Sequence, residues 1–212
     1  MNLIVLVLYL VGLVLVFGVR TLQSWRATGD TRFRRPDTTA FGAPWWGTVL
    51  FAAACLLGAA APVTAIAAGT SAPSPAVAWF GVGTMTAGLL LVLAAQRGMG
   101  DSWRVGVQEG ESTELVTGGL FALVRNPVFT GMAVLLAGMV VALPGALSVA
   151  ALAVLVIAVQ VQVRLIEEPY LLSAHGAAYR SYAARTGRFL PLLGRLAPPG
   201  RDSGRRGGSR PR

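Results

Sequence analysis

The chain has no lysine, only one cysteine and few charges for its length. All 18 basic side chains among its 212 residues are arginine, and this bias, together with much alanine, glycine and valine, is typical of GC-rich bacterial genomes. The single thiol, Cys55, excludes an internal disulfide and is expected to pack as a small apolar residue. Charged residues make up 13% of the chain, whereas a soluble domain carries about a quarter. This deficit indicates a protein embedded in lipid.

Five apolar runs alternate with more polar connections. They cover residues 3–19, 45–69, 76–95, 128–143 and 145–166. A membrane-spanning helix needs about 20 apolar residues, with a range of about 17 to 25. Four runs meet this length, and the fourth in order meets it when residues 125–128 are counted at the membrane interface. The sequence therefore predicts an all-α integral membrane protein with about five transmembrane helices.

The arginines are confined to alternate connections, which predicts the orientation. Arginine occurs in residues 20–44, in 96–127 and in the tail, whereas 70–75 has no charge and 143–145 is only Leu-Pro-Gly. The positive-inside rule then predicts an outside N-terminus and a cytoplasmic C-terminus, in the bacterial cytoplasmic membrane. The net charge of +9 is expected to meet anionic lipid headgroups and not nucleic acid. We expect the first run to be a retained anchor, because it is not preceded by a positive side chain.

The stretch LVRNPVFTGM, residues 123–132, opens the fourth run with a charge, a cap and a proline. Asparagine is a preferred N-cap, and proline is favoured at the first helical position. Asn126 and Pro127 therefore predict a sharp helix start, with its positive dipole end beside Arg125 as an anion site. The alternative is an ordinary helix start with an arginine that extends to the headgroups.

A second polar stretch, RLIEEPYLLSAHGAAYRSYAARTGRFLP, spans residues 164–191. Pro169 predicts an end or a kink of the fifth helix at Glu168. Two carboxylates at the end of a membrane helix need partners, and Arg164 and Arg125 are candidates for Glu167 and Glu168. A short interfacial C-terminal helix is expected to follow. The alternative here is an amphipathic helix with Tyr179 and Tyr182, which share one face, at headgroup level.

Three other features have simpler interpretations. The only histidine, His175, precedes Gly176, a predicted helix C-cap, so a structural role is favoured over a role as base. The glycine spacing of GVGTMTAG, residues 81–88, resembles a nucleotide-binding loop but lies within an apolar run, where small residues allow close helix packing. No spacing of metal ligands or of a catalytic triad is present, so no metal site is predicted.

The two polar stretches resemble the isoprenylcysteine carboxyl methyltransferase family and the related phospholipid N-methyltransferases. Family members show Leu-Val, a Gly-Pro-Tyr-like turn and Arg-His-Pro-x-Tyr-x-Gly, compared with LVTGGLFALVRNPVFTG at 115–131 here. They then show Glu-Glu, Gly-x-x-Tyr-x-x-Tyr and an arginine before a proline, compared with 167–191 here. The similarity covers about the second half of the chain. It suggests three regions: N-terminal spans over 1–95, a methyltransferase-like region over 96–195 and a disordered arginine-rich tail over 196–212.

The resemblance implies S-adenosylmethionine as methyl donor and a lipophilic or small thiol, carboxylate or amine as acceptor. Arg125 and Glu168 are the implied catalytic residues. The implied cofactor-binding residues are Gly119, Leu120, Phe121, Arg125, Asn126, Pro127, Glu167, Glu168, Tyr179, Tyr182 and Arg188. Either glutamate suits the cationic sulfonium or ammonium, Arg125 or the helix start suits the carboxylate, and the turn at 118–121 suits the adenine. Asn126 and Phe129 replace the family histidine and tyrosine, so the resemblance names no general base.

Two alternatives from other classes remain open at this level. An NADPH-dependent membrane reductase is one, because sterol reductases resemble the same family in their last helices. Those chains have about twice as many spans, and the extra phosphates of their cofactor would require more arginines. A non-enzymatic membrane scaffold is the other, and it would bind neither cofactor.

Overall fold

The computed structural model describes residues 1–19, 41–70, 74–99 and 115–197. The arginines predicted to face the cytoplasm between 20 and 35 and at 104, and the predicted disordered tail from 198 onward, lie outside these residues. The regular secondary structure of the described part is helical, apart from one isolated bridge. Its elements are α1 (Asn2–Leu13), the π-helical η1 (Val14–Val19), α3 (Ala43–Ala67), α4 (Pro75–Met99), α5 (Leu120–Leu123), α6 (Pro127–Ala142), α7 (Ala146–Val161), the π-helical η3 (Gln162–Glu167) and α8 (Glu168–Arg185).

Each of the five predicted apolar runs forms a helix. Three continuous helices are long and apolar enough to cross a membrane: α3, α4 and the one that runs from α7 through η3 into α8. Shorter apolar helices cover Asn2–Gly18 and Pro127–Ala142. The all-α membrane fold predicted from the sequence is therefore confirmed.

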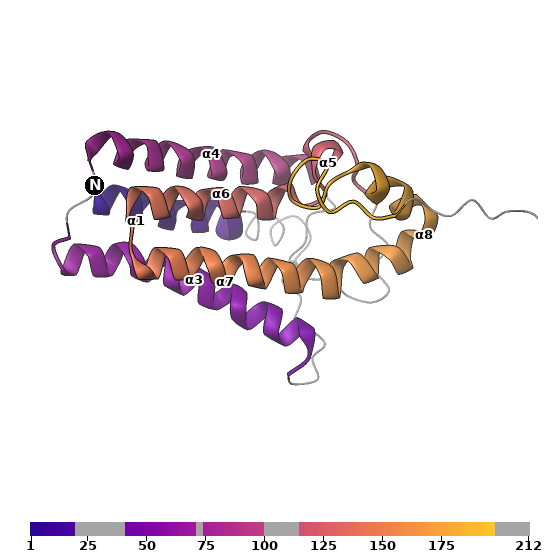
Figure 1. Cartoon of the computed structure of the whole chain (residues 1–212), viewed down its shortest axis with the longest axis horizontal. Helices are drawn as coiled ribbons and strands as arrows, with labels where there is room; N and C mark the ends of the chain where they lie inside the picture. The colour runs from indigo at the N-terminus through magenta and orange to yellow at the C-terminus, as the bar shows by residue number, and fades with distance from the viewer. Residues whose placement is uncertain (20–40, 71–73, 100–114, 198–212) are drawn as a thin grey trace, which may run out of the picture.

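The apolar helices form one bundle. Helix α4 packs along α6, α3 packs along α7, and α1 contacts both α3 and α4 (Figure 1). The bundle has a continuous core that includes Val5, Met85, Met139 and Leu155, all buried. Consecutive helices run in opposite directions, so α6 begins and α7 ends at the same end of the bundle (Figure 1).

Glycines set the close contact between α4 and α6. A Cβ added at Gly131 would lie 2.8 Å from the carbonyl oxygen of Gly88, and one added at Gly138 would lie 2.7 Å from that of Gly81. The two glycine pairs are each seven residues apart on antiparallel helices, so the backbones touch at two levels. This confirms that the GVGTMTAG segment is a helix-packing motif. It also fixes the start of α6 against the end of α4.

Of the two outcomes predicted at Glu168, an end or a kink, the end does not occur, because the helix continues through this residue. Glu168 has helical dihedral angles, and its N–H donates to the carbonyl of Val163, five residues back. This wider π-helical turn makes room for the ring of Pro169, which in an α-helix would clash with the preceding turn. The break comes instead at Gly176, whose φ of 49° ends the first part of α8, as predicted for a glycine C-cap.

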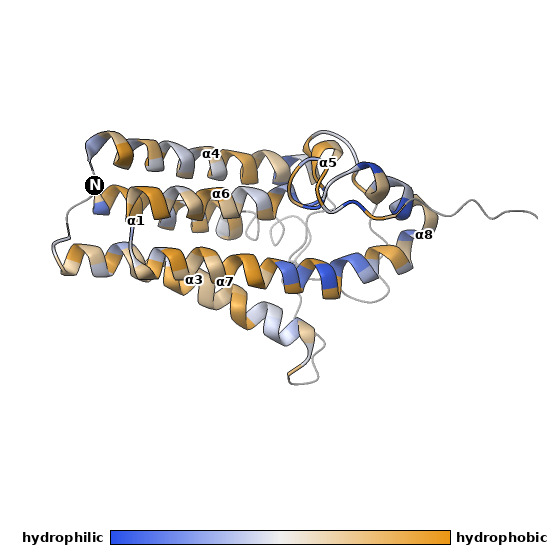
Figure 2. Ribbon diagram, viewed as in Figure 1, coloured by the Kyte–Doolittle hydropathy of each residue, from blue (hydrophilic) through white to orange (hydrophobic). Residues whose placement is uncertain are grey.

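Polar residues gather at one end of this bundle. The hydrophilic stretch begins in η3 and continues through α8, beside the start of α6 and the short helix α5 (Figure 2). After the break at Gly176, the second part of α8 turns back toward α5 (Figure 1). Segments far apart in the sequence therefore meet at this end.

Candidate active site

Two extended segments lie side by side where α6 begins. Val124 forms a parallel bridge with Gly187, and the N–H of Arg125 donates to the Gly187 carbonyl at 2.8 Å. The N–H of Asn126 donates to the carbonyl of Arg188 at 3.1 Å. The segment after α8 is thus tied by its backbone to the residues that precede Pro127.

Asn126 occupies the N-cap position of α6, but its side chain does not cap the helix. It makes no side-chain cap hydrogen bond, and its Nδ2 donates to the carbonyl of Arg188 at 3.0 Å. Thr130, one turn further on, donates to the carbonyl of Phe189 at 2.8 Å. The predicted cap bond is wrong because the segment after α8 offers carbonyl oxygens to which these side chains donate. Pro127 is buried at the first helical position, as predicted.

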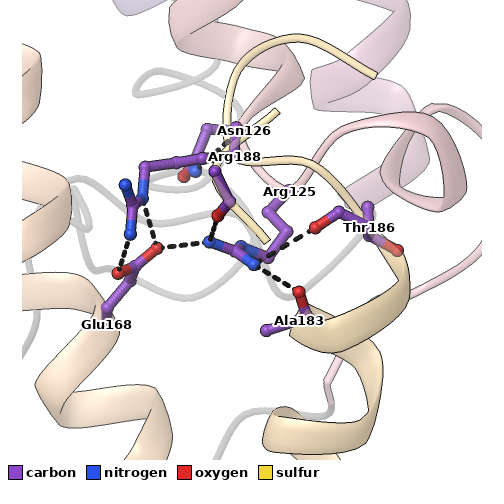
Figure 3. Close-up of polar contacts among 7 residues, drawn as sticks. Arg125, Asn126, Glu168, Ala183, Thr186 and Arg188 are labelled. Carbon is purple, nitrogen blue, oxygen red and sulfur yellow. Dashed lines mark hydrogen bonds and ion pairs between the residues drawn. The ribbon is translucent and has the colours of Figure 1, made fainter. Parts of the chain in front are cut away.

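The side chain of Arg125 is the centre of the cluster (Figure 3). Its Nη1 donates to the carbonyls of Ala183 at 2.8 Å and Thr186 at 3.1 Å. Its Nη2 donates to Glu168 Oε1 at 2.7 Å and to the carbonyl of Gly194 at 3.0 Å. The side chain is only 2% exposed, so the alternative of an arginine that extends to the headgroups is wrong. Arg125 instead joins α6, α8 and the segment beyond it.

Glu168 is bound by two arginines. Besides the bond from Arg125, it accepts Arg188 Nε on Oε1 at 2.7 Å and Arg188 Nη2 on Oε2 at 2.9 Å (Figure 3). These hydrogen bonds raise the pKa of the Arg188 guanidinium above its ordinary value. The prediction that Arg125 meets the glutamate pair is confirmed for Glu168. Two guanidinium groups against one carboxylate leave the cluster with one positive charge.

Glu167 has a different environment. It is half-buried and accepts a hydrogen bond of 3.3 Å from Gln162 Nε2. No ion pair to Glu167 occurs among the described residues. Arg164, the predicted neighbouring partner, is exposed and pairs with neither glutamate. Of the two adjacent carboxylates, one is thus neutralised and the other is not.

The two tyrosines of α8 share one face, as predicted, but this face is buried. Tyr179 is 2% and Tyr182 5% exposed, and their rings meet edge to face with centroids 6.1 Å apart. The Tyr182 hydroxyl donates to the carbonyl of Phe121 at 2.6 Å. The alternative of tyrosines at headgroup level is therefore wrong. The bond joins α8 to α5, where Gly119 precedes Leu120 with a φ of 59° that favours glycine.

The arrangement fits a ligand with charges of both signs. In the described part of the chain, Arg125 Nε is buried without a hydrogen-bond partner, and the cluster around it has an excess positive charge. Next to it, Glu167 is a carboxyl group without an ion pair among these residues, and burial raises its pKa to about 7. The described residues contain no group of His, Cys, Asp and Glu that could hold a metal ion. His175 makes no hydrogen bond or ion pair with the cluster.

Several residues of this site were missed by the sequence interpretation. Thr130 and the backbone carbonyls of Ala183, Thr186, Gly187 and Gly194 all anchor the arginine or its neighbours. Among these missed residues, only Thr130 acts through its side chain. Its position one helical turn after Asn126 is the signal that the sequence could have offered. The carbonyl acceptors have no side-chain signature, so only the folded backbone reveals them.

Comparison with known proteins identifies the central part of the chain. Residues 76–178, nearly half of it, match the phospholipid methyltransferase family. The matched region runs from α4 into α8 and contains Arg125, Asn126 and both glutamates. No match was found among individual curated proteins. The match favours the methyltransferase interpretation over a reductase or a scaffold. On this match and on its apolar helices, the chain is a membrane methyltransferase that uses S-adenosylmethionine to methylate a lipid acceptor.

Proposed function

We propose that the polar cluster at the start of α6, beside η3 and α8, is the S-adenosylmethionine site. The observation that carries this proposal is the convergence of Arg125, Glu168 and Arg188 in one buried ion cluster beside the unpaired Glu167. The other members of the proposed site are Gly119, Leu120, Phe121, Asn126, Pro127, Tyr179 and Tyr182. All of them lie on the elements that meet at this end of the bundle.

The two glutamates have different roles in this proposal. Both oxygens of Glu168 are occupied by arginine, so Glu168 acts as a positioning residue that holds the site together. Glu167 is the carboxylate that meets a cationic group of the cofactor, since it has no positive partner among the described residues. Arg125 likewise positions the site through four hydrogen bonds. The excess positive charge that Arg125 and Arg188 create favours the cofactor carboxylate.

When bound, S-adenosylmethionine would supply an electrophilic methyl group for a lone pair of the acceptor. The residues of the chain have mainly to orient the reactants, since a near-attack geometry is the largest contribution available for such a transfer. Buried tyrosines and the backbone pairing of residues 124–126 with residues 187 and 188 connect the segments at this end of the bundle. The tie between α8 and Phe121 holds the turn at 118–121 in place for the adenosine part.

We further propose that all five apolar helices span the membrane, with the site on the cytoplasmic side. The uninterrupted part of this helix, residues 146–175 before the break at Gly176, is about 45 Å long, which exceeds the hydrocarbon thickness of about 30 Å. Its polar end must therefore project beyond the apolar layer. Trp46 near the start of α3 and Trp79 near the start of α4 are exposed at opposite ends of the bundle, as aromatic residues at the two membrane interfaces would be.

The test is a titration of the purified protein with S-adenosylmethionine and with S-adenosylhomocysteine. Loss of a hydrogen bond to a charged group costs about 1.5–3 kcal/mol, so Glu167→Gln should weaken binding of the methyl donor roughly 10- to 150-fold. Arg164→Gln changes the charge by one unit at an exposed neighbour and should leave the affinity unchanged. If Glu167 meets the sulfonium, S-adenosylhomocysteine, whose sulfur carries no charge, should lose less affinity than the donor. If Glu167 meets the ammonium, both should lose equally. Unchanged affinity for both ligands would refute the proposed site.

A further inference from the structure

An apolar cavity of about 40 Å³ lies inside the helix bundle. Its wall includes Tyr9 and Val16 from the first helical segment, and Ala54 and Cys55 from α3. The Tyr9 hydroxyl donates to the carbonyl of Cys55 at 3.0 Å, so this polar group is already satisfied. A cavity with such a wall does not hold ordered water, because water needs two to four polar partners.

The cavity lies on the membrane side of the polar cluster. Met132 of α6 lines it and is seven residues beyond Arg125, about 10 Å along the helix axis. Val92 of α4 also lines it, near the end of α4 that contacts α5. This separation is shorter than one leaflet of the hydrocarbon layer, about 15 Å, and so lies within the length of one lipid chain.

Most of the cavity wall comes from outside the matched methyltransferase region. The segments that contain Tyr9, Val16, Phe51 and Ala54 all precede residue 76, where the family match begins. The π-helical turn η1 is held at this place by Gln96, which donates to the carbonyl of Val16 at 2.9 Å. The N-terminal helices thus complete a surface that the matched region alone does not close.

We propose that this cavity binds a short stretch of the hydrocarbon chain of the lipid acceptor, and that α1 with η1 and α3 determine which chains are accepted. The inference rests on the proposed function, because it needs the methyl donor at the polar cluster. Three observations support this occupant: an apolar wall without free polar groups, a position beneath the cluster, and a protein that methylates lipids. The space takes only a few methylene groups of one chain and excludes a headgroup.

The experiment changes the cavity without touching the polar cluster. Ala54 is buried in the wall, and Ala54→Leu fills part of the space. Ala52 lies two residues earlier on the same helix and is exposed, so Ala52→Leu is the matched control. Purified protein in detergent is given dioleoyl or dihexanoyl phosphatidylethanolamine, and the increase in melting temperature is measured for each lipid, since a bound ligand stabilises the folded state. This readout does not require turnover.

The long-chain lipid should stabilise the wild type and the Ala52→Leu variant more than the short-chain lipid does. This difference should be lost in Ala54→Leu, while the affinity for S-adenosylmethionine stays unchanged. Where labelled methyl transfer to these lipids is observed, the KM of Ala54→Leu for the dioleoyl lipid should rise about tenfold, without a change for the dihexanoyl lipid. If Ala54→Leu does not bind the methyl donor and so has not folded, Ala54→Val makes the same test with a smaller side chain.

Two results would overturn the inference. In the first, the wild type gains no more stability from the long chain than from the short one, which makes the cavity a packing gap. In the second, the chain-length difference persists in the variant that fills the cavity, which places the chain on the outer surface of the bundle. Failure of the proposed function is recognised separately, because the wild type would then not bind S-adenosylmethionine at the Glu167 site.

Discussion

Replacing Arg125 by lysine keeps the positive charge and removes the planar fork. Arg125 donates four hydrogen bonds to acceptors on three different segments: Glu168, two carbonyls at the end of α8, and the carbonyl of Gly194. Lysine has three donors on one nitrogen. It therefore leaves at least one of these acceptors without its partner, and its single nitrogen cannot span the separation that the two Nη atoms cover.

The cost follows from how deeply the site is buried. The side chain of Arg125 is 2% exposed and that of Glu168 is 9% exposed, so water does not replace a lost bond. Each buried acceptor left without a partner costs about 1–3 kcal/mol. One or two such losses predict a destabilisation of about 2–5 kcal/mol, which for a chain of this size corresponds to a melting temperature lower by roughly 5–15 °C.

The assay is thermal unfolding of the detergent-purified protein, followed by tryptophan fluorescence. Arg185→Lys is the control, since Arg185 is an exposed arginine near the end of the same helix α8, and its replacement should stay within about 0.5 kcal/mol of the wild type. An Arg125→Lys variant that melts at the wild-type temperature would show that charge alone suffices. The four hydrogen bonds would then not be what joins α6 to α8.

Two further variants test the packing around the site. Gly88→Ala should lower the free energy of unfolding by about 1–3 kcal/mol through overpacking, because the added Cβ would lie 2.7 Å from the carbonyl oxygen of Gly131. The control Gly83→Ala should not lower it, because a Cβ there meets nothing within 4 Å. Equal melting temperatures of the two variants would contradict the glycine contact between α4 and α6. Tyr182→Phe should lose about 0.5–1.5 kcal/mol with its bond to Phe121. The Tyr179 hydroxyl has no hydrogen-bond partner in the described part of the chain, so Tyr179→Phe should keep the melting temperature of the wild type and bind S-adenosylmethionine less tightly. If Tyr179→Phe lowers the melting temperature and Tyr182→Phe weakens binding instead, Tyr179 has the structural role and Tyr182 the binding role.

Helix positions followed directly from the sequence, because apolar runs long enough to span a membrane have few alternatives. The meeting of Arg125 with Glu168 also followed, since two polar stretches separated by a tight hairpin must lie at the same end. The hairpin itself is closed by Ser148, which donates to the carbonyl of Leu143 at 2.7 Å. These features depend on hydrophobicity and chain length, which the sequence shows.

Partner choice within the site did not follow, because local spacing competes with tertiary contacts. Spacing along a helix favoured Arg164 as the partner of a glutamate, but the segment after α8 brings Arg188 to Glu168 in a more buried position. For the same reason Asn126 bonds to the Arg188 carbonyl and does not cap its own helix. The effect of Pro169 was misjudged because a π-helical turn accommodates a proline that an α-helix would not.

The most direct test of the central claim is an experimental structure of the protein with S-adenosylhomocysteine bound. The proposed site predicts the amino-acid part of this ligand within hydrogen-bond distance of Glu167 and of the cluster formed by Arg125 and Arg188, with the Arg125–Glu168 pair still in place. A ligand bound at the opposite end of the bundle, or one that leaves Glu167 without a contact, would contradict it.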